Sequence, residues 1–556
     1  MIRSILNRAV AITAAVLLAG WSAGAVAALD QAIRQALEAA SADPVGRVVR
    51  EQWSTRGDVP RFVHPIAPFR ATAFARDVLD VLADASSRGL DAATYGVDAL
   101  RAALELPHDA AAAARFEAAL ALAWGRFLAD AGYGRVDPKL LGHDLPRWRG
   151  RDTLPTALRT ALAAPSAAEA LDSIEPAWPA YRALRDGLAD WRRRPTLPPP
   201  RPLPRPGPPG TVSPGDAWPG VSELRERLRR EGDLGEADAA AAGWQAVQEG
   251  RYVGELVDAV RRFQARHGLA VDGVIGPRTF AALDVPTADR VRQIERSLER
   301  LRWLGPLPQG RFVAVNIPEF RLWAVDSGRV VASMAVVVGR AASPTPVFVD
   351  TIEAVELNPF WNVPPSIASR ELYPKFARDP GWLAAEGMTL IGAEAVAPGD
   401  LRHALATGRA RLRQSPGERN ALGRVKLVMP NAHHVYLHDT PAQALFAHSR
   451  RDFSHGCIRV ERPRELASFV LAGRPEESLE WIGKAIATGR THRVRPVAPI
   501  PVLIFYSTVG VGEDGRLRFL PDVYGHDARF DAALARRRPA IDPRAGACLG
   551  IDAWAG

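Results

Sequence analysis

The hydrophobic pattern of the chain changes its period near residue 311, and this change separates a helical half from a β-rich half. Residues 29–193 and 217–306 repeat apolar side chains every three or four positions, which predicts amphipathic helices. From Arg311 onward, short apolar runs such as 312–317 and 330–338 lie between Gly, Pro, Asp and Ser positions, which predicts strands. The expected fold is a multidomain α+β chain in which helical N-terminal domains precede a β-sandwich-like domain.

Changes in composition divide the 556 residues further. At this length several domains are expected, because one hydrophobic core rarely serves more than about 300 residues. A run of prolines cannot form a packed helix or a central strand, so it predicts an extended linker. The expected segments are a signal peptide at 1–28, an all-α scaffold domain at 29–193, the Pro-rich linker at 194–216, a small three-helix domain at 217–286, a connecting helix at 287–310, a β-rich domain at 311–490 with a helical capping insertion at 370–422, a C-terminal extension at 491–537 and a tail at 538–556.

The N-terminus has the pattern of an export signal. Arg3 and Arg8 precede an apolar run from Ala9 to Gly20, and residues 25–27 read Ala-Val-Ala, which is a cleavage site for signal peptidase. The apolar run is short for a membrane-spanning helix. Export with cleavage is therefore expected, and an uncleaved anchor is the alternative.

Charge and cysteine content narrow the class of protein. The net charge is +9, from 71 basic and 62 acidic residues, but no basic block is interleaved with aromatic residues, so no nucleic-acid partner is expected. A basic surface suits an anionic polymer such as a cell wall. Only Cys457 and Cys548 are present, which is too few for a disulfide-dependent exported fold, and Cys548 is expected to have no role.

The stretch around Cys457 contains the parts of a cysteine acyl-transfer site. A thiol needs a neighbouring base to attack an amide, and His438 and His455 are candidates. Two short strands could bring His438 to Cys457, with Val435 and Leu437 pointing into a core. The amides of Gly456 and its neighbours are candidate oxyanion donors.

Two other readings of this stretch remain open from spacing alone. A single buried cysteine is usually an inert small hydrophobe. A metal site would need further ligands, but no second thiol lies near Cys457 and the HExxH spacing is absent, so no metal is expected.

The motif as a whole resembles the signature of L,D-transpeptidases with a YkuD-type catalytic domain. His438 is followed after fifteen residues by Ser-His-Gly-Cys-Ile at 454–458, and Arg459 then occupies a position that is Asn or Arg in that family. The order of the preceding strand motifs resembles the same domain. The family resemblance implies a thioester acyl-enzyme on Cys457, release of D-Ala from a peptidoglycan stem, and a 3→3 cross-link after attack by a second stem.

The resemblance also implies the roles of individual residues. His438 would be the base, with His455 as the alternative, and an acceptor at Asp439, in either its backbone or its side chain, would orient the His438 ring. The implied catalytic residues are Cys457, His438, His455 and Gly456, and the implied substrate-binding residues are Tyr436, Arg459, Trp361 and Asp439.

The helical half carries a second resemblance. Residues 263–279 contain Phe-Gln, His-Gly-Leu, Asp-Gly and Ile-Gly in an order that resembles the three-helix peptidoglycan-binding domain, and residues 29–193 weakly resemble the scaffold of the large YcbB-like subfamily. We therefore expect a periplasmic monomer that needs no cofactor, with peptidoglycan stems as substrate and other cell-wall synthesis proteins as candidate partners. Two alternative functions are consistent with the same residues and motifs. One is an L,D-carboxypeptidase or a hydrolase that releases wall-attached protein, and the other is a non-catalytic wall-binding protein.

Overall fold

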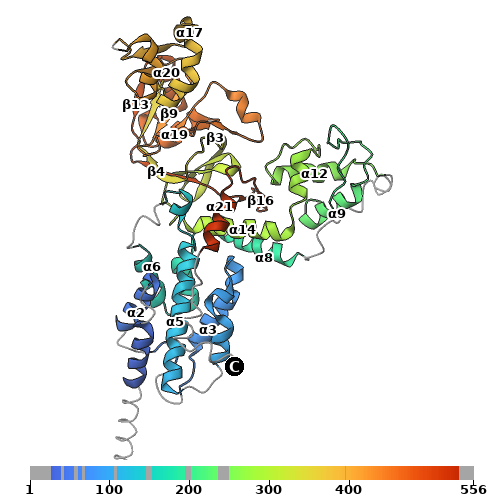
Figure 1. The fold of residues 1–556 in the computed structure, drawn as a ribbon, viewed down its shortest axis with the longest axis vertical. Helices are drawn as coiled ribbons and strands as arrows, with labels where there is room; N and C mark the ends of the chain where they lie inside the picture. The colour runs from blue at the N-terminus through green and yellow to red at the C-terminus, as the bar shows by residue number, and fades with distance from the viewer. Residues whose placement is uncertain are drawn as a thin grey trace, which may run out of the picture.

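The computed structural model describes residues 27–38, 43–55, 60–64, 69–104, 109–145, 153–194, 202–235, 250–394 and 396–536. Most of the predicted signal peptide, part of the Pro-rich linker, Cys548 and the predicted tail lie outside these residues. The helical N-terminal half and the β-rich C-terminal half are both present, as the hydrophobic pattern predicts (Figure 1).

The scaffold domain is built around one long buried helix, α5 (Ala110–Tyr133). Asp109 caps this helix by accepting a hydrogen bond from the Ala112 amide. Neighbouring helices approach α5 closely at glycines, because a side chain at Gly125 would collide with Val49 and one at Gly132 with Ile174. The other scaffold helices are α2 (Pro44–Thr55), α3 (Ala73–Ala83), α4 (Val97–Leu104), α6 (Thr153–Ala163) and α7 (Ala167–Ile174).

Two helices join the scaffold to the β-rich domain. The helices α8 (Pro179–Arg193) and α14 (Thr287–Arg302) pack against each other, and both lie at the centre of the molecule in Figure 1. The buried residues of α8, including Trp191, belong to the hydrophobic core of the β-rich domain and not to that of the scaffold. Helix α8 thus extends the core of the β-rich domain toward the scaffold.

The small helical module projects to one side of this centre (Figure 1). It consists of α9 (Val221–Glu231), α12 (Glu255–Arg266) and α13 (Pro277–Leu283) around their own apolar core. Its sequence motif is structural. Gln264 donates to the carboxylate of Asp272 at 2.9 Å and accepts from the amide of Gly273 at 2.9 Å, which holds the turn before α13.

The β-rich domain is a curled sheet whose two halves meet at β3 (Arg329–Gly339). The first part of β3 pairs with β2 (Arg321–Asp326), and its last residues pair with β12 (Ile458–Val460) and β11 (Asp452–Ser454). The strand order is β13-β5-β9-β10-β12-β3-β2-β1-β14-β4. The remaining strands are β1 (Phe312–Asn316), β4 (Phe348–Ile352), β5 (Ala354–Leu357), β9 (Val425–Val428), β10 (Leu437–His438), β13 (His492–Val494) and β14 (Ile500–Phe505).

The sheet continues beyond residue 490, where the sequence predicts the start of a separate extension. Strand β14 lies between β1 and β4, so the segment after residue 490 completes the sheet. The rest of the extension forms β15 (Val509–Val511), β16 (Leu517–Phe519) and α21 (His526–Ala535). Helices α19 (Pro463–Leu471) and α20 (Leu479–Ala487) pack against the half of the sheet that contains β5.

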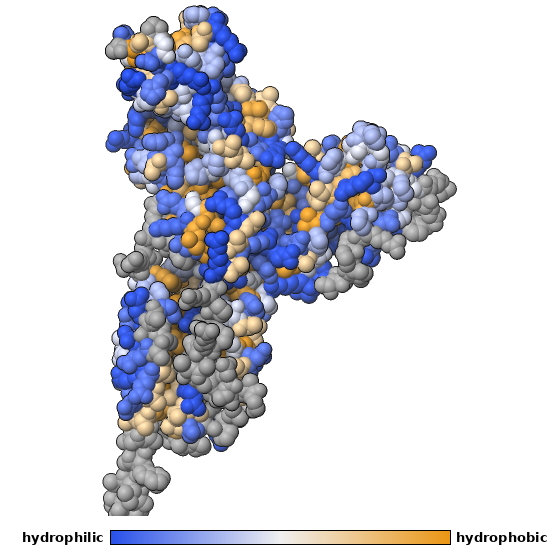
Figure 2. All heavy atoms as spheres, in the orientation of Figure 1, coloured by the Kyte–Doolittle hydropathy of each residue, from blue (hydrophilic) through white to orange (hydrophobic). Residues whose placement is uncertain are grey.

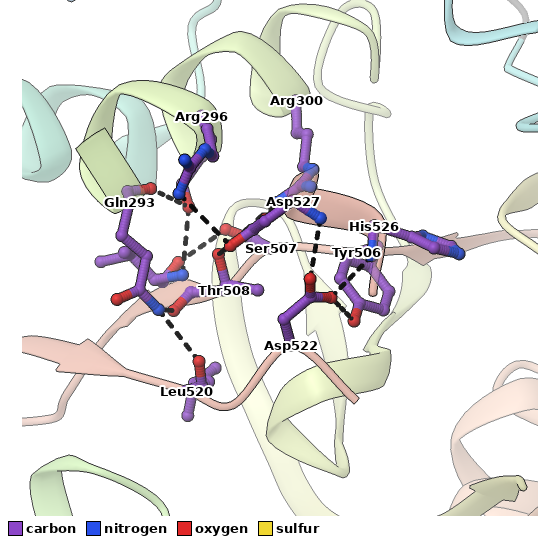
Figure 3. A network of polar contacts seen from close by, with 12 residues as sticks. Gln293, Arg296, Arg300, Tyr506, Ser507, Thr508, Leu520, Asp522, His526 and Asp527 are labelled. Atoms are coloured by element: carbon purple, nitrogen blue, oxygen red, sulfur yellow. Dashed lines mark hydrogen bonds and ion pairs between the residues drawn. The ribbon is translucent and has the colours of Figure 1, made fainter. Parts of the chain in front are cut away.

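Polar contacts from α14 fix the extension in place (Figure 3). Gln293 donates to the carbonyls of Thr508 and Leu520 at 2.8 and 2.9 Å, and Arg300 forms an ion pair of 2.6 Å with Asp527. Asp522 accepts from the amide of His526 at 2.8 Å. The extension is thus bound to the helix that also contacts the scaffold.

The capping insertion is a small subdomain with its own core, and it is not purely helical as predicted. A three-stranded sheet in the order β6-β8-β7 packs with short helices around Leu372, Phe376 and Leu412. We call residues 361–414 the cap. Its elements are β6 (Trp361–Asn362), α15 (Pro365–Ile367), the π-helical turn η6 (Ala368–Leu372), α16 (Tyr373–Phe376), α17 (Gly381–Ala385), β7 (Met388–Ile391), α18 (Leu401–Ala406) and β8 (Arg411–Gln414).

The surface is mixed in character. The face drawn in Figure 2 is mostly hydrophilic, with apolar residues scattered over it. None of the helices in the described part of the chain is long and apolar enough to cross a membrane.

Candidate active site

The backbone around Cys457 brings the predicted site residues onto two neighbouring strands. Leu437 of β10 pairs with Ile458 of β12 in parallel register, and the Ile458 amide donates to the Tyr436 carbonyl at 3.1 Å. Leu437 and Ile458 are fully buried in the core. Because side chains alternate along a strand and parallel partners point to the same side, the opposite face carries the site residues. These are Tyr436, His438, Cys457 and Arg459.

The segment 454–457, which we call the thiol loop, is held by its own hydrogen bonds. Ser454 Oγ donates to the Cys457 carbonyl at 2.5 Å and accepts from the Gly456 amide at 3.1 Å. Thr345 Oγ1 donates to the Gly456 carbonyl at 2.8 Å. Gly456 has φ +117°, a conformation that favours glycine. Its amide is engaged by Ser454, so the contribution of Gly456 seen here is to the shape of the loop.

The Cys457 thiol contacts the strand beside it. It faces the His434 carbonyl at 3.8 Å, and the backbone and the phenol of Tyr436 lie close enough to affect its pKa. Burial raises the pKa of the thiol, whereas the Tyr436 contacts and the charges of Lys426 and Arg459 lower it, and burial prevails. The resting nucleophile is therefore a neutral thiol.

His438 is the buried histidine of the site. Its side chain is enclosed, and its Nδ1–H donates to the Asp439 carbonyl at 2.5 Å. The ring also lies edge-on to Tyr436, with 5.6 Å between ring centroids. Burial and the nearby charge of Arg459 lower the pKa of His438 to about 3, so the imidazole is neutral and able to accept a proton.

Asp439 contributes its backbone to this arrangement, which answers a question that the sequence left open. Its carboxylate accepts from the amides of Arg424 and Thr440, both at 2.7 Å, and so belongs to the turn after β10. A side chain at Gly423 would collide with that carboxylate. The carbonyl of Asp439, and not its side chain, orients the His438 ring.

Arg459 forms no ion pair within the part of the chain that the structure describes. It lies opposite His438 in the strand register, and its Nε is buried without a hydrogen-bond partner among the described residues. Burial lowers its pKa, and the neighbouring Cys457 acts in the opposite direction. An uncompensated guanidinium beside a nucleophile can bind an anionic group of a substrate.

His455 contacts the cap. It is exposed, and its Nε2–H donates to the Glu371 carboxylate at 2.6 Å. Glu371 belongs to η6 of the cap and also lies 3.4 Å from Arg340. Trp361, also of the cap, lies close enough to Tyr436 to lower the pKa of its hydroxyl, against the larger effect of burial. The cap therefore contacts the thiol loop through Glu371 and approaches Tyr436 through Trp361.

Some residues of the site carry no signal in the sequence. Glu371 lies inside the insertion, where no motif singles it out. Tyr524 lies in the C-terminal extension, and its hydroxyl accepts from the Thr345 amide at 3.2 Å and donates to the Gly339 carbonyl. Ser454 could have been found, because it is part of the motif that contains Cys457. Within the described ranges, no group of three or more His, Cys, Asp or Glu residues could hold a metal ion.

Comparisons with known families match three parts of the chain. Residues 310–477 match the "L,D-transpeptidase catalytic domain", residues 49–188 match the "Scaffold domain", and residues 219–283 match the "Putative peptidoglycan binding domain". These matches agree with the three resemblances drawn from the sequence.

Individual relatives carry the same description. A protein of Haemophilus influenzae named "Putative L,D-transpeptidase" is 29% identical over 309 residues, which are 53% of this chain and 62% of that protein. Among solved structures, an L,D-transpeptidase from Stackebrandtia nassauensis is 15% identical, with a TM-score of 0.21 over 53% of this chain and 94% of that one. L,D-transpeptidase 3 from Mycobacterium tuberculosis is 17% identical, with a TM-score of 0.17 over 35% and 60%.

Proposed function

We propose that this chain, which contains an L,D-transpeptidase catalytic domain together with scaffold and peptidoglycan-binding domains, is a cysteine transpeptidase that forms 3→3 cross-links between peptidoglycan stems. The observation that carries the proposal is the pairing of β10 with β12. Cys457 and His438 lie on the same face of these strands, and burial lowers the pKa of His438, which supports its assignment as the base.

The reaction would proceed in two balanced steps. The Cys457 sulfur attacks the carbonyl of the third stem residue, and His438 accepts the thiol proton. The bond to D-Ala breaks, the departing amine takes the proton from His438, and a thioester remains. The amine of a second stem then attacks the thioester, loses a proton to His438, and the thiol re-forms as the new amide leaves. No cofactor enters either step.

The resting geometry is suited to substrate-driven activation. In the unliganded protein the thiol contacts Tyr436, and its pKa is raised by burial. Catalytic hydrogen bonds are often loose before substrate binds, so Cys457 would turn toward His438 when a stem occupies the groove. Tyr436 touches both residues and would form the floor of that groove, with Trp361 as its wall.

Arg459 supports the choice of a stem peptide as substrate. A peptide that ends in D-Ala carries a carboxylate close to the bond that breaks, and Arg459 offers an unpaired cation close to the thiol. A charge-assisted hydrogen bond between them would hold the donor stem in register with Cys457.

Transfer to an amine is favoured over transfer to water by two features. The cap contacts the thiol loop through Glu371 and approaches Tyr436 through Trp361, which would limit access of bulk water to the thioester. A wall-binding module on the same chain would raise the local concentration of a second stem. Because the substrate lies outside the cytoplasm, the protein would act in the periplasm after export by its N-terminal segment.

Product analysis tests the proposal. Purified protein is incubated with disaccharide-tetrapeptides, and the products are separated and sequenced by mass spectrometry. The proposal expects dimers with a 3→3 bond and one free D-Ala per dimer. If tripeptide monomers alone form, the enzyme is a carboxypeptidase, and if no D-Ala is released, the chain is a wall-binding protein.

A further inference from the structure

The contact between Glu371 and the thiol loop has no counterpart in the site inferred from sequence. Glu371 lies on the cap, whereas its two partners lie on the catalytic sheet. His455 Nε2 approaches Glu371 Oε1 to 2.6 Å and Arg340 Nη2 approaches the same oxygen to 3.4 Å. One carboxylate thus links three chain segments.

Both partners belong to the frame that supports Cys457. His455 is two residues before the nucleophile, and Arg340 follows β3. The Arg340 amide donates to the Ser454 carbonyl at 2.9 Å, so the two segments are also joined to each other. Gly339, next to Arg340, donates to Thr345 Oγ1 at 2.8 Å, and Thr345 in turn donates to the Gly456 carbonyl. The Glu371 carboxylate therefore contacts two segments of this support, through Arg340 and His455.

The backbone around Glu371 is unusual. Residues Ala368–Leu372 form a π-helical turn between the short helices α15 and α16. Such turns are rare because their hydrogen bonds are less favourable than those of an α-helix, and they are frequent at functional sites. The turn is anchored by Ser369 Oγ, which donates to the Pro365 carbonyl at 2.8 Å.

The cap is a separate packing unit. Its core is separate from that of the catalytic sheet, and its stem is tied by Asn420, which donates to the carbonyls of Pro359 and Ser415 at 3.0 and 2.9 Å. A rigid cap on a defined stem needs a contact at its far side to fix the closed position. Glu371 supplies such a contact at the thiol loop, and Trp361 lies close to Tyr436 beside it.

We infer that Glu371 is a positioning residue of the active site, which through His455 and Arg340 holds the cap closed and fixes the thiol loop beneath it. Only the expected effect of Glu371 on catalysis rests on the proposed function. Closure itself concerns the accessibility of Cys457, which can be measured without substrate.

The test compares Glu371→Gln, Glu371→Asp and the control Glu394→Gln, an exposed cap residue, in the full chain. The rate of Cys457 alkylation by iodoacetamide is followed by mass spectrometry of the peptide that contains it. Glu371→Gln should raise this rate roughly two- to fivefold, the effect of losing one half-exposed ion pair. In the Glu371→Gln variant, hydrogen exchange should also rise in residues 365–372. The control Glu394→Gln should leave both the alkylation rate and the hydrogen exchange unchanged.

Steady-state kinetics separate positioning from a purely structural role. The account expects Glu371→Gln to lower kcat with tetrapeptide substrate while KM changes little, and Glu371→Asp to recover part of the loss. Alkylation and exchange equal to those of the parent protein in Glu371→Gln would overturn the inference. If Glu371→Gln changes the alkylation rate as expected but the parent protein makes no cross-links, the inference about cap closure stands and the proposed function is refuted.

Discussion

At the scale of single residues, the thiol and the buried histidine of the site carry no charge at rest. Cys457 and His438 are both neutral, because burial opposes a thiolate on one and an imidazolium on the other. The exposed alternative base, His455, is occupied by Glu371. Arg459 Nε has no hydrogen-bond partner in the described part of the chain, which makes this guanidinium a natural contact for an anionic substrate.

The protonation state of the thiol predicts its reactivity. Since burial raises the pKa of Cys457, alkylation should remain slow near neutral pH and increase above pH 8.5, the ordinary range for cysteine. Iodoacetamide labelling of the free enzyme between pH 6 and 10 measures this. A labelling rate that is already constant at pH 7 would mean that a stable thiolate is present and that the neutral resting state is wrong.

Arg459 offers a prediction with opposite effects on activity and stability. Arg459→Gln should lower kcat/KM for tetrapeptide stems by roughly ten- to a hundredfold, the effect of losing a hydrogen bond to a charged group. Because Arg459 is half-buried and its Nε lacks a hydrogen-bond partner among the described residues, its desolvation is costly, and the thermal midpoint of the variant should stay equal or rise. Arg459→Lys should recover part of the activity. A variant with full activity would show that the donor carboxylate is bound elsewhere.

At the scale of elements, strand β3 and the turn that follows it support the nucleophile. Gly339 ends β3 where the chain folds back on itself, and any side chain there would collide with the backbone of Ser343 and Thr345. That turn places Thr345 against Gly456. The sequence predicts the strand and the turn residues, but it does not predict that Tyr524, about 180 residues later, hydrogen-bonds to the same turn.

Gly339→Ala tests this support. The substitution should destabilise the protein by about 1–3 kcal/mol, as overpacking does, and should reduce acylation because Thr345 is displaced. The matched control is Gly483→Ala in α20, where nothing lies within 4 Å of the added methyl group. Replacement of this helical glycine should leave the free energy of unfolding unchanged or raise it by about 0.5–1 kcal/mol. Equal effects on urea unfolding in both variants would contradict the role of the turn.

What the sequence predicts and what it misses differ in the range of the contacts involved. Short-range patterns predict the helices, the strands and the face shared by Cys457 and His438, because alternation along β10 and β12 fixes which side chains point together. Contacts between distant segments leave no periodic signal. Glu371, Tyr524 and the mixed fold of the cap could not be predicted, since each depends on packing between regions far apart in the chain.

At the scale of the whole molecule, a buried pair of histidines helps to join the scaffold to the C-terminal extension. His143 Nε2 lies 3.2 Å from His526 Nδ1, and α14 ties the same extension to the centre of the molecule (Figure 3). The extension in turn supports the thiol loop through Tyr524. The scaffold and the active site are therefore parts of one connected framework.

This contact predicts a loss of stability in acid. Burial lowers the pKa of His143 to about 3 and that of His526 to about 4. The unfolded chain then binds these protons more readily, so stability should fall as pH drops from about 6.5 toward 4. His526→Asn should flatten the dependence of the thermal midpoint on pH, whereas His403→Asn, at an exposed position, should not. Parallel pH profiles for His526→Asn and the parent protein would refute the prediction.

The central claim is that Cys457 carries the acyl group, and intact-mass spectrometry tests it most directly. Rapid mixing of enzyme with a tetrapeptide stem, followed by acid quenching, should show a covalent adduct whose mass equals that of the stem without D-Ala. Hydroxylamine should remove this adduct, because it cleaves thioesters. Cys548→Ser should form the same adduct, and Cys457→Ala should form none. An adduct that persists in Cys457→Ala, or that maps to Cys548, would contradict the account.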